Sequence, residues 1–265
     1  MAPELALDPQ ADAPLDWENP SPPDNLIFDD GEPLESNRHR IAMNVLIHSA
    51  QQWLLPRPDT FVGGNMFVYY SRNQAMNRDF RGPDFFAALG VEAERERQGW
   101  VVWEEAGHYP DVIIELLSPS TAAVDRGIKK DLYEQVFRTP DYFVFDPFDP
   151  STLAGWRLDL ALGYQPLSPN ESGWLWCETL DLWLGPWEGV ISREPATGSC
   201  FWLRFYTPQG ELVLLPDELA QQERQRAEQE RQRAEQERRL ADQERQRAAR
   251  LAAKLQELGI DPETV

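Results

Sequence analysis

The spacing of hydrophobic positions predicts an α/β core between residues 40 and 147. Apolar residues recur at helical spacing in "RIAMNVLIHSAQQWLL" (40–55), which predicts an amphipathic helix. Three apolar runs have the length and composition of strands. They are "NMFVYY" (65–70), "DFFAALGV" (84–91) and "WVVWEEAG" (100–107). Next come "PDVIIELLSPST" (110–121), "AAVDRGIKKDLYEQVF" (122–137) and "DYFVFDP" (141–147), whose strand, helix, strand order predicts a crossover unit of a sheet.

From residue 153 to residue 215 the pattern changes to short strands separated by Gly, Pro and Asn, as in hairpins. This section either adds antiparallel strands to the same sheet or forms a small β lid. Its tryptophans have two interpretations, hairpin packing or a platform for sugar binding.

The C-terminal part has a seven-residue period. "ERQRAEQ" begins at residues 223 and 230 and recurs in degraded form from 237 and 244, so that alanines share one heptad position. Leucines fill a second position only at Leu251 and Leu258, where earlier repeats have glutamate. The pattern is compatible with a solvated charged helix or with a weak coiled coil.

These patterns predict four sections. Residues 1–25 are acidic and proline-rich and are expected to be a disordered leader. Residues 26–215 form the folded domain, 216–258 the charged helix, and 259–265 a tail. No apolar run approaches membrane-spanning length, and two cysteines are too few for a disulfide framework, so a cytoplasmic setting is expected.

The negative charge lies almost entirely before the predicted C-terminal helix. Residues 217–258 contain ten acidic and ten basic residues, which leaves 33 acids and 15 bases in residues 1–216, a net charge of −18. Nucleic-acid affinity usually depends on basic surfaces, so this balance opposes easy DNA binding. "NRHR" (37–40) and "RDFR" (78–81) are the segments that could supply a local basic patch.

Glu115 is the most unusual residue of the sequence. It interrupts "VIIELL", a run typical of a strand that is covered on both faces. Burying a carboxylate without a partner costs on the order of several kcal/mol of stability. This cost is offset only if a cation or strong hydrogen-bond donors lie next to the carboxylate. Glu115 is therefore expected to have a cation or hydrogen-bond donor next to it and a functional role.

A set of chemically active residues surrounds Glu115 in the predicted fold. Asp84 stands at the entry of another strand, and Asp125, Lys129 and Tyr133 follow at i,i+4 steps along the next helix. Two carboxylates and a lysine can bind Mg²⁺, activate water and offset negative charge on a phosphate. Each also has a purely structural interpretation: Asp84 in a Pro-Asp turn, Glu115 as a buried paired carboxylate, and Lys129 as a surface lysine.

Other polar residues leave alternatives open. Asp111 is either a strand-entry residue or a further ligand, and His39, at the start of the first helix, is either structural or close to the cleft. Ser118 and Ser120 are expected to stabilise the turn before the helix.

The segments "GPDFF", "PDVIIELLSPST", D-x3-K-x3-Y (125–133) and "DYFVFDP" resemble the restriction-endonuclease-like proteins of the Uma-two type, which belong to the PD-(D/E)XK nuclease superfamily. The resemblance covers roughly residues 26–190. It implies a mixed β-sheet flanked by helices, here with extra antiparallel strands and a long C-terminal helix. It also implies a Mg²⁺ or Mn²⁺ cofactor and hydrolysis of phosphodiester bonds in DNA.

The resemblance assigns roles to individual residues. Asp84 matches the first acid of the motif and Glu115 the second, both as metal ligands and catalytic residues. Position 117, where the superfamily usually has its lysine, is Leu117, and Lys129 resembles a migrated replacement. A further acid on the first helix is common in the superfamily, and Glu35 or Glu32 would be its equivalent.

Three functional hypotheses follow. The first is a metal-dependent endonuclease, expected to be a homodimer. The second is an inactive nuclease-like scaffold that binds a protein partner through residues 217–258, which would suit both the acidity and Leu117. The third, a carbohydrate-binding or glycosidase domain, rests only on tryptophans and paired acids.

Overall fold

The structure is a computed structural model that describes residues 26–28, 36–76, 82–192, 194 and 198–257. The predicted leader, Glu32, Glu35, the 78–81 basic segment and the 259–265 tail lie outside the described residues. Within the described part, no helix is long and apolar enough to span a membrane.

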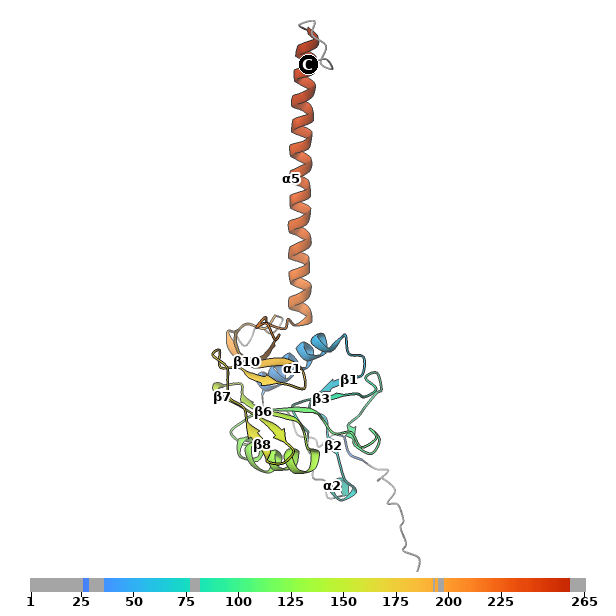
Figure 1. Cartoon of the computed structure of the whole chain (residues 1–265), viewed down its shortest axis with the longest axis vertical. Helices are drawn as coiled ribbons and strands as arrows, with labels where there is room; N and C mark the ends of the chain where they lie inside the picture. Colours follow the sequence, from blue (N-terminus) through green and yellow to red (C-terminus); the bar gives the residue numbers. More distant parts are fainter. Residues whose placement is uncertain (1–25, 29–35, 77–81, 193, 195–197, 258–265) are drawn as a thin grey trace, which may run out of the picture.

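A six-stranded mixed sheet forms the centre of the molecule (Figure 1), in the order β1-β3-β5-β6-β7-β8. Only β5 and β6 are parallel, and all other neighbours in this sheet are antiparallel. The helical segment after β5 makes the crossover to β6, as the strand, helix, strand pattern predicts. The strands are β1 (Thr60–Gly63), β3 (Phe85–Leu89), β5 (Val112–Leu116), β6 (Asp141–Asp146), β7 (Asp149–Asp159) and β8 (Gly163–Pro166).

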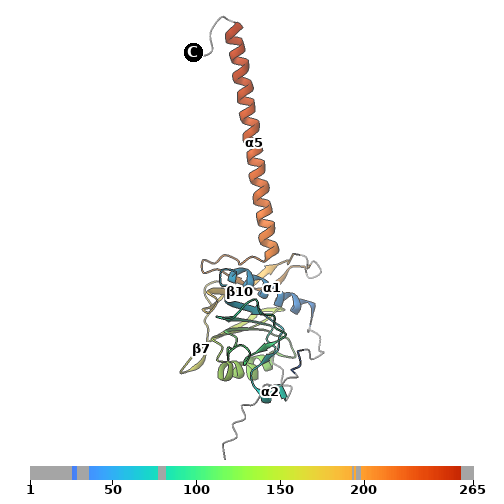
Figure 2. The ribbon, with the colours of Figure 1, turned by 90° about the vertical axis from the view of Figure 1, so that its right-hand side faces the viewer.

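Each face of this sheet has its own core, because successive side chains of β5 point to opposite faces. Val112, Ile114 and Leu116 pack on the face covered by helix α1 (Asn37–Leu54). Ile113 and Leu117 pack on the other face, against the helical segment of residues 122–137. Figures 1 and 2 show α1 and this segment (green) on opposite sides of the sheet. The sheet with its two helical layers confirms the predicted α/β class.

The segment of residues 122–137 is helical, but it is not one regular α-helix. It consists of α3 (Ala122–Val124), a π-turn η1 (Asp125–Lys129), α4 (Lys130–Leu132) and a second π-turn η2 (Tyr133–Phe137). Each π-turn adds a residue to the turn and shifts the helical phase. For this reason Ile128 and Val136, which the helical pattern predicts on the buried face, are 64% and 44% exposed, whereas Tyr133 and Phe137 are buried.

The hairpin section confirms the first alternative, strands added to the main sheet, and also contains a separate sheet. β7 and β8 extend the main sheet, whereas β9 (Leu175–Cys177), β10 (Leu182–Gly189) and β11 (Cys200–Tyr206) form a separate antiparallel sheet. This second sheet packs with α1, and its Trp202 is buried in the same core.

Two strand predictions are corrected. The 100–107 segment is extended only in β4 (Trp100–Val101), after which a turn follows in which Ala106 and Gly107 have φ of 53° and 84°. The 65–70 segment forms only β2 (Val68–Tyr69), which pairs with β4 in a small parallel sheet and precedes the short helix α2 (Arg72–Met76). The polar residues of "EEAG" favour the turn over a longer strand.

Helix α5 (Pro216–Glu257) extends from the globular part as a single rod (Figures 1 and 2). Glu218, in its first turn, accepts hydrogen bonds from Arg204 Nη2 (2.7 Å), Arg204 Nη1 (3.1 Å) and the backbone N–H of Leu215 (2.8 Å). Because Arg204 is fully buried, this bidentate pair fixes the base of α5 to β11.

Candidate active site

Asp84 and Glu115 come together because β3 and β5 are antiparallel neighbours. Phe85 is paired with Ile114, and the same register brings Asp84 opposite Glu115. The backbone N–H of Asp84 points to Glu115 Oε2 at 3.4 Å, and the backbone N–H of Leu116 donates to Asp84 Oδ2 at 2.7 Å. The two predicted acids therefore belong to one site at the end of β5.

Glu115 is 1% exposed and has the partners that its burial requires. Tyr133 OH donates to Glu115 Oε1 at 2.7 Å, and Lys129 Nζ lies 3.1 Å from the same oxygen. Lys129 Nζ also lies 2.8 Å from Oδ1 of the buried Asp125. The ammonium group of Lys129 thus bridges two carboxylates, and the predicted line of Asp125, Lys129 and Tyr133 faces Glu115.

The electrostatics of this cluster are dominated by burial and by an excess of acids. Burial raises the pKa of the Glu115 carboxyl to about 8; Lys129 opposes this shift, whereas Asp84 and Asp125 add to it. Burial alone would lower the pKa of Lys129, but the carboxylates of Glu115 and Asp125 outweigh it and raise that pKa above its ordinary range. Burial and the Glu115 carboxylate also raise the pKa of Tyr133, which therefore remains a hydroxyl donor.

His39 belongs to α1, which covers the opposite face of the sheet from residues 122–137, and it contacts Asp84 of the site. Its backbone N–H is capped by Ser36 Oγ at the start of α1, and its Nε2 lies 2.7 Å from Asp84 Oδ1. The His39 side chain is 4% exposed and that of Asp84 is 15% exposed. Both oxygens of Asp84 therefore have a partner, one from α1 and one from the backbone of β5.

Several other residues named in the sequence analysis lie outside this cluster or have other partners. Asp111 stands before the opposite end of β5, where its Oδ2 accepts from the backbone N–H of Leu89 (2.7 Å). Leu117 is 3% exposed in the core. In "NRHR", Arg38 stacks over the ring of Phe148 (4.4 Å), and Arg40 pairs with Glu194 at 2.8 Å.

Three members of this cluster have no role that the sequence pattern alone predicts. Asp125 and Tyr133 were indicated only by their alignment with Lys129, and His39 only by its place on the first helix. The signal for the first two was the i,i+4 spacing of polar residues on the face that the crossover turns to the sheet. Nothing local pairs His39 with Asp84, since 45 residues separate them.

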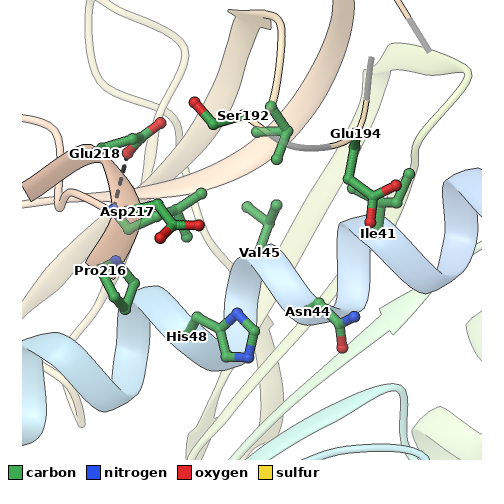
Figure 3. Close-up of a pocket in the computed structure, with 11 residues that line it drawn as sticks. Ile41, Asn44, Val45, His48, Ser192, Glu194, Pro216, Asp217 and Glu218 are labelled. Atoms are coloured by element: carbon green, nitrogen blue, oxygen red, sulfur yellow. Dashed lines mark hydrogen bonds between the residues drawn. The ribbon is translucent and has the colours of Figure 1, made fainter. Parts of the chain in front are cut away.

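A separate cavity of about 330 Å³ lies at the base of α5 (Figure 3). Its walls include Val45 and His48 of α1 and Asp217 of α5, and Figure 3 shows the side chains of Ser192 and Glu194 on its other side. None of Asp84, Glu115 and Lys129 lines it. This cavity is therefore distinct from the cluster around Glu115.

Comparison with known proteins identifies a family and a similar solved structure. Over residues 13–186 the chain matches the family Uma2, whose description is "Putative restriction endonuclease". The fold is also similar to the crystal structure of "a putative nuclease belonging to DUF820" from Anabaena variabilis, with 16% identity and a TM-score of 0.38 over 58% of this chain and 81% of that one.

No curated protein matches the chain. The Uma2 match extends over more than half of the sequence and includes Asp84, Glu115 and Lys129. The chain therefore belongs to the Uma2 family, whose description is "Putative restriction endonuclease".

Proposed function

We propose that this protein is a metal-dependent endonuclease that hydrolyses phosphodiester bonds of DNA. Asp84 and Glu115 are the proposed metal ligands, and Lys129 is the proposed catalytic lysine. The observation that carries the proposal is the buried Glu115, opposite Asp84 on the neighbouring strand and 3.1 Å from Lys129. Family membership supports the same nuclease chemistry.

The donor set fits Mg²⁺ or Mn²⁺. Mg²⁺ is commonly held by one or two carboxylates, with water and substrate phosphate as the other ligands. Among the described residues, no three His, Cys, Asp or Glu side chains are grouped so that they could hold a metal by themselves. Asp84 and Glu115 supply two carboxylates, and with Asp125 the acids of the cluster outnumber its lysine by three to one. A divalent cation would offset this excess.

The residues of the chain have separate tasks in this proposal. When bound, the metal supplies Lewis-acid activation of water and stabilises charge on the phosphate. Asp84 is kept in orientation by His39 and by the backbone N–H of Leu116, and Glu115 by Tyr133. The ammonium group of Lys129 can turn toward the negative charge that develops on the phosphate.

The proposal includes a cellular setting and an assembly. Cys177 and Cys200 are both free thiols, which favours a reducing, cytoplasmic location. A homodimer, expected from the sheet edges and the heptad pattern, is part of the proposal. The net charge of −18 in residues 1–216 is an obstacle to DNA binding that a metal in the site would reduce locally.

Cleavage of plasmid and single-stranded DNA with Mg²⁺ or Mn²⁺ tests this function. The wild type should cut, whereas Asp84→Asn, Glu115→Gln and Lys129→Met should each lose at least 100-fold in rate while their circular dichroism spectra remain native. Arg126→Met, an exposed residue of the same crossover segment, is the matched control and should cut normally. If the wild type does not cut, or if the three variants cut equally well, the proposal is wrong.

One observation favours a second candidate, an inactive nuclease-like scaffold. Lys129 Nζ is held between Glu115 and Asp125 at 3.1 and 2.8 Å, so the cluster is already paired without a metal. Titration with Mn²⁺ separates the candidates, because a scaffold should bind no metal at Asp84 and Glu115. Its Glu115→Gln variant should then be at least as stable as the wild type.

A further inference from the structure

Helix α5 is uncovered along most of its length. Every described residue from 221 to 251 is exposed, and Figures 1 and 2 show the rod leaving the globular part without returning to it. The helix has 42 residues and thus a length of about 63 Å. The charge pattern of α5 indicates which kind of partner could pack against it.

The repeated heptad places an alanine stripe between two charged rows of opposite sign. Around Ala227, Glu230 lies about 60° to one side and Arg231 about 40° to the other, at 3.6 residues per turn. The same three residue types recur seven residues earlier and seven and fourteen residues later. The outer rows alternate again, with Glu228 beyond Arg231 and Arg233 beyond Glu230.

This arrangement distinguishes between the two ways in which identical helices can pair. In a parallel two-fold pair, the row on one side of the stripe faces the row on the other side of the partner helix. Glutamate then faces arginine in the inner rows and again in the outer rows. In an antiparallel pair each row faces its own copy, so that glutamate meets glutamate and arginine meets arginine.

We propose that α5 pairs with α5 of a second copy, parallel and in register, with the alanine stripe at the centre. Alanine permits a close approach of the two helices, and like charges that face each other disfavour the reverse orientation. The proposed pairing does not depend on whether the globular domain is a nuclease, because it is inferred from residues 220–251 alone.

Two effects oppose the pairing and limit its affinity. The charged rows already form pairs within one helix, such as Arg226 with Glu230 (3.4 Å) and Arg231 with Glu228 (3.6 Å). Residues 1–216 have a net charge of −18 in each copy, so they repel each other when they lie at the same end. That repulsion is screened within about 8 Å at physiological salt. The charges therefore determine direction more than strength, since exposed ion pairs contribute little stability.

Disulfide trapping in the full chain tests the orientation. In a Cys200→Ser background, where the remaining native thiol of Cys177 is buried, Ala227→Cys and Ala248→Cys should each form a disulfide-linked dimer under mild oxidation. Gln225→Cys and Gln246→Cys, two residues away on the opposite side of the helix, are the matched controls. Each control should give at least ten-fold less dimer than its alanine-position partner.

Other outcomes overturn the proposal. If the two alanine-position variants link only when mixed, the helices are antiparallel, since residues 227 and 248 are then opposite each other. If the controls link equally well, or if light scattering at about 100 µM shows a monomer, α5 is a solvated helix. A mass above that of a dimer also contradicts a pair.

Charge exchange gives an independent test. The triple change E230R/E237R/E244R places arginine in both inner rows of a parallel pair between residues 230 and 245, and it should reduce the trapped dimer at least ten-fold. Adding R231E/R238E/R245E restores opposite rows and should restore the dimer. If the sixfold variant is not restored, the inner rows do not determine the pairing.

Discussion

At the residue scale, the site consists of three carboxylates around one ammonium group. Glu115 is 1% exposed and has Asp84 and Asp125 as its acidic neighbours, so burial and repulsion both oppose its ionised form. Lys129 and Tyr133 compensate part of that cost. Without a metal, the acidic neighbours favour a proton on Glu115. In the proposed function, a bound divalent cation would replace that proton.

This balance predicts a pH-dependent stability in metal-free buffer. The pKa of Glu115 is about 8 in the folded protein and has its ordinary value of 4.5 in the unfolded chain. Between these values the folded state binds the proton and the unfolded state does not, so the free energy of unfolding should decrease as the pH rises from about 5 to about 8. Lys129 does not titrate in this range, because its pKa is raised.

Urea denaturation at several pH values measures this effect. Glu115→Gln removes the titrating group and should give a flatter profile. Lys129→Met removes the cation that lowers the pKa of Glu115, so the decrease should continue to higher pH. Equal slopes in the wild type and Glu115→Gln would show that other groups cause the pH dependence.

His39 has a testable role in the orientation of Asp84. His39→Ala removes the partner of Asp84 Oδ1 and should weaken Mn²⁺ binding by about 10-fold, a usual effect of losing a residue that orients a metal ligand. His39→Gln retains an N–H donor and should recover part of the affinity. Calorimetric titration with Mn²⁺ gives both values.

His48→Ala is the matched control, because His48 is exposed on the same helix and lines the separate cavity. It should bind Mn²⁺ like the wild type. If His39→Ala also binds normally, His39 serves only the packing of α1.

At the element scale, the base of α5 depends on one ion pair. Glu218→Ala leaves the fully buried guanidinium of Arg204 without its carboxylate partner, which should destabilise the fold by about 3 kcal/mol. Thermal unfolding measures the loss. Glu223→Ala, one turn further along on an exposed position, should leave the melting temperature unchanged.

The same scale shows what the sequence could predict. The buried pattern of β5 and the i,i+4 line of Asp125, Lys129 and Tyr133 identified the neighbours of Glu115, because both signals depend on local periodicity. The two π-turns, the early end of the strand at β4 and the contact of His39 with Asp84 were not predicted. They depend on tertiary packing, which a local pattern does not encode. The strand β1 was missed because "TFVG" is too short to show a period.

At the scale of the whole molecule, the globular part and the helix are expected to be thermodynamically separate. A chain that ends after Glu223 retains Glu218 and loses a segment whose described residues are exposed up to residue 251. Its melting temperature should equal that of the full chain, and only its association should change. If the truncated chain melts at a lower temperature than the full chain, both measured at low protein concentration, then α5 also stabilises the globular part.

The sequence separations within the cluster also set an order for its assembly. The ion pair of Lys129 with Asp125 spans four residues, the hydrogen bond of Tyr133 with Glu115 spans 18, and the contact of His39 with Asp84 spans 45. Closing longer loops costs more chain entropy, so the contact between His39 and Asp84 is expected to form late in folding. A partly folded chain would then contain the lysine and one acid but not an oriented Asp84. The complete site would exist only in the native protein.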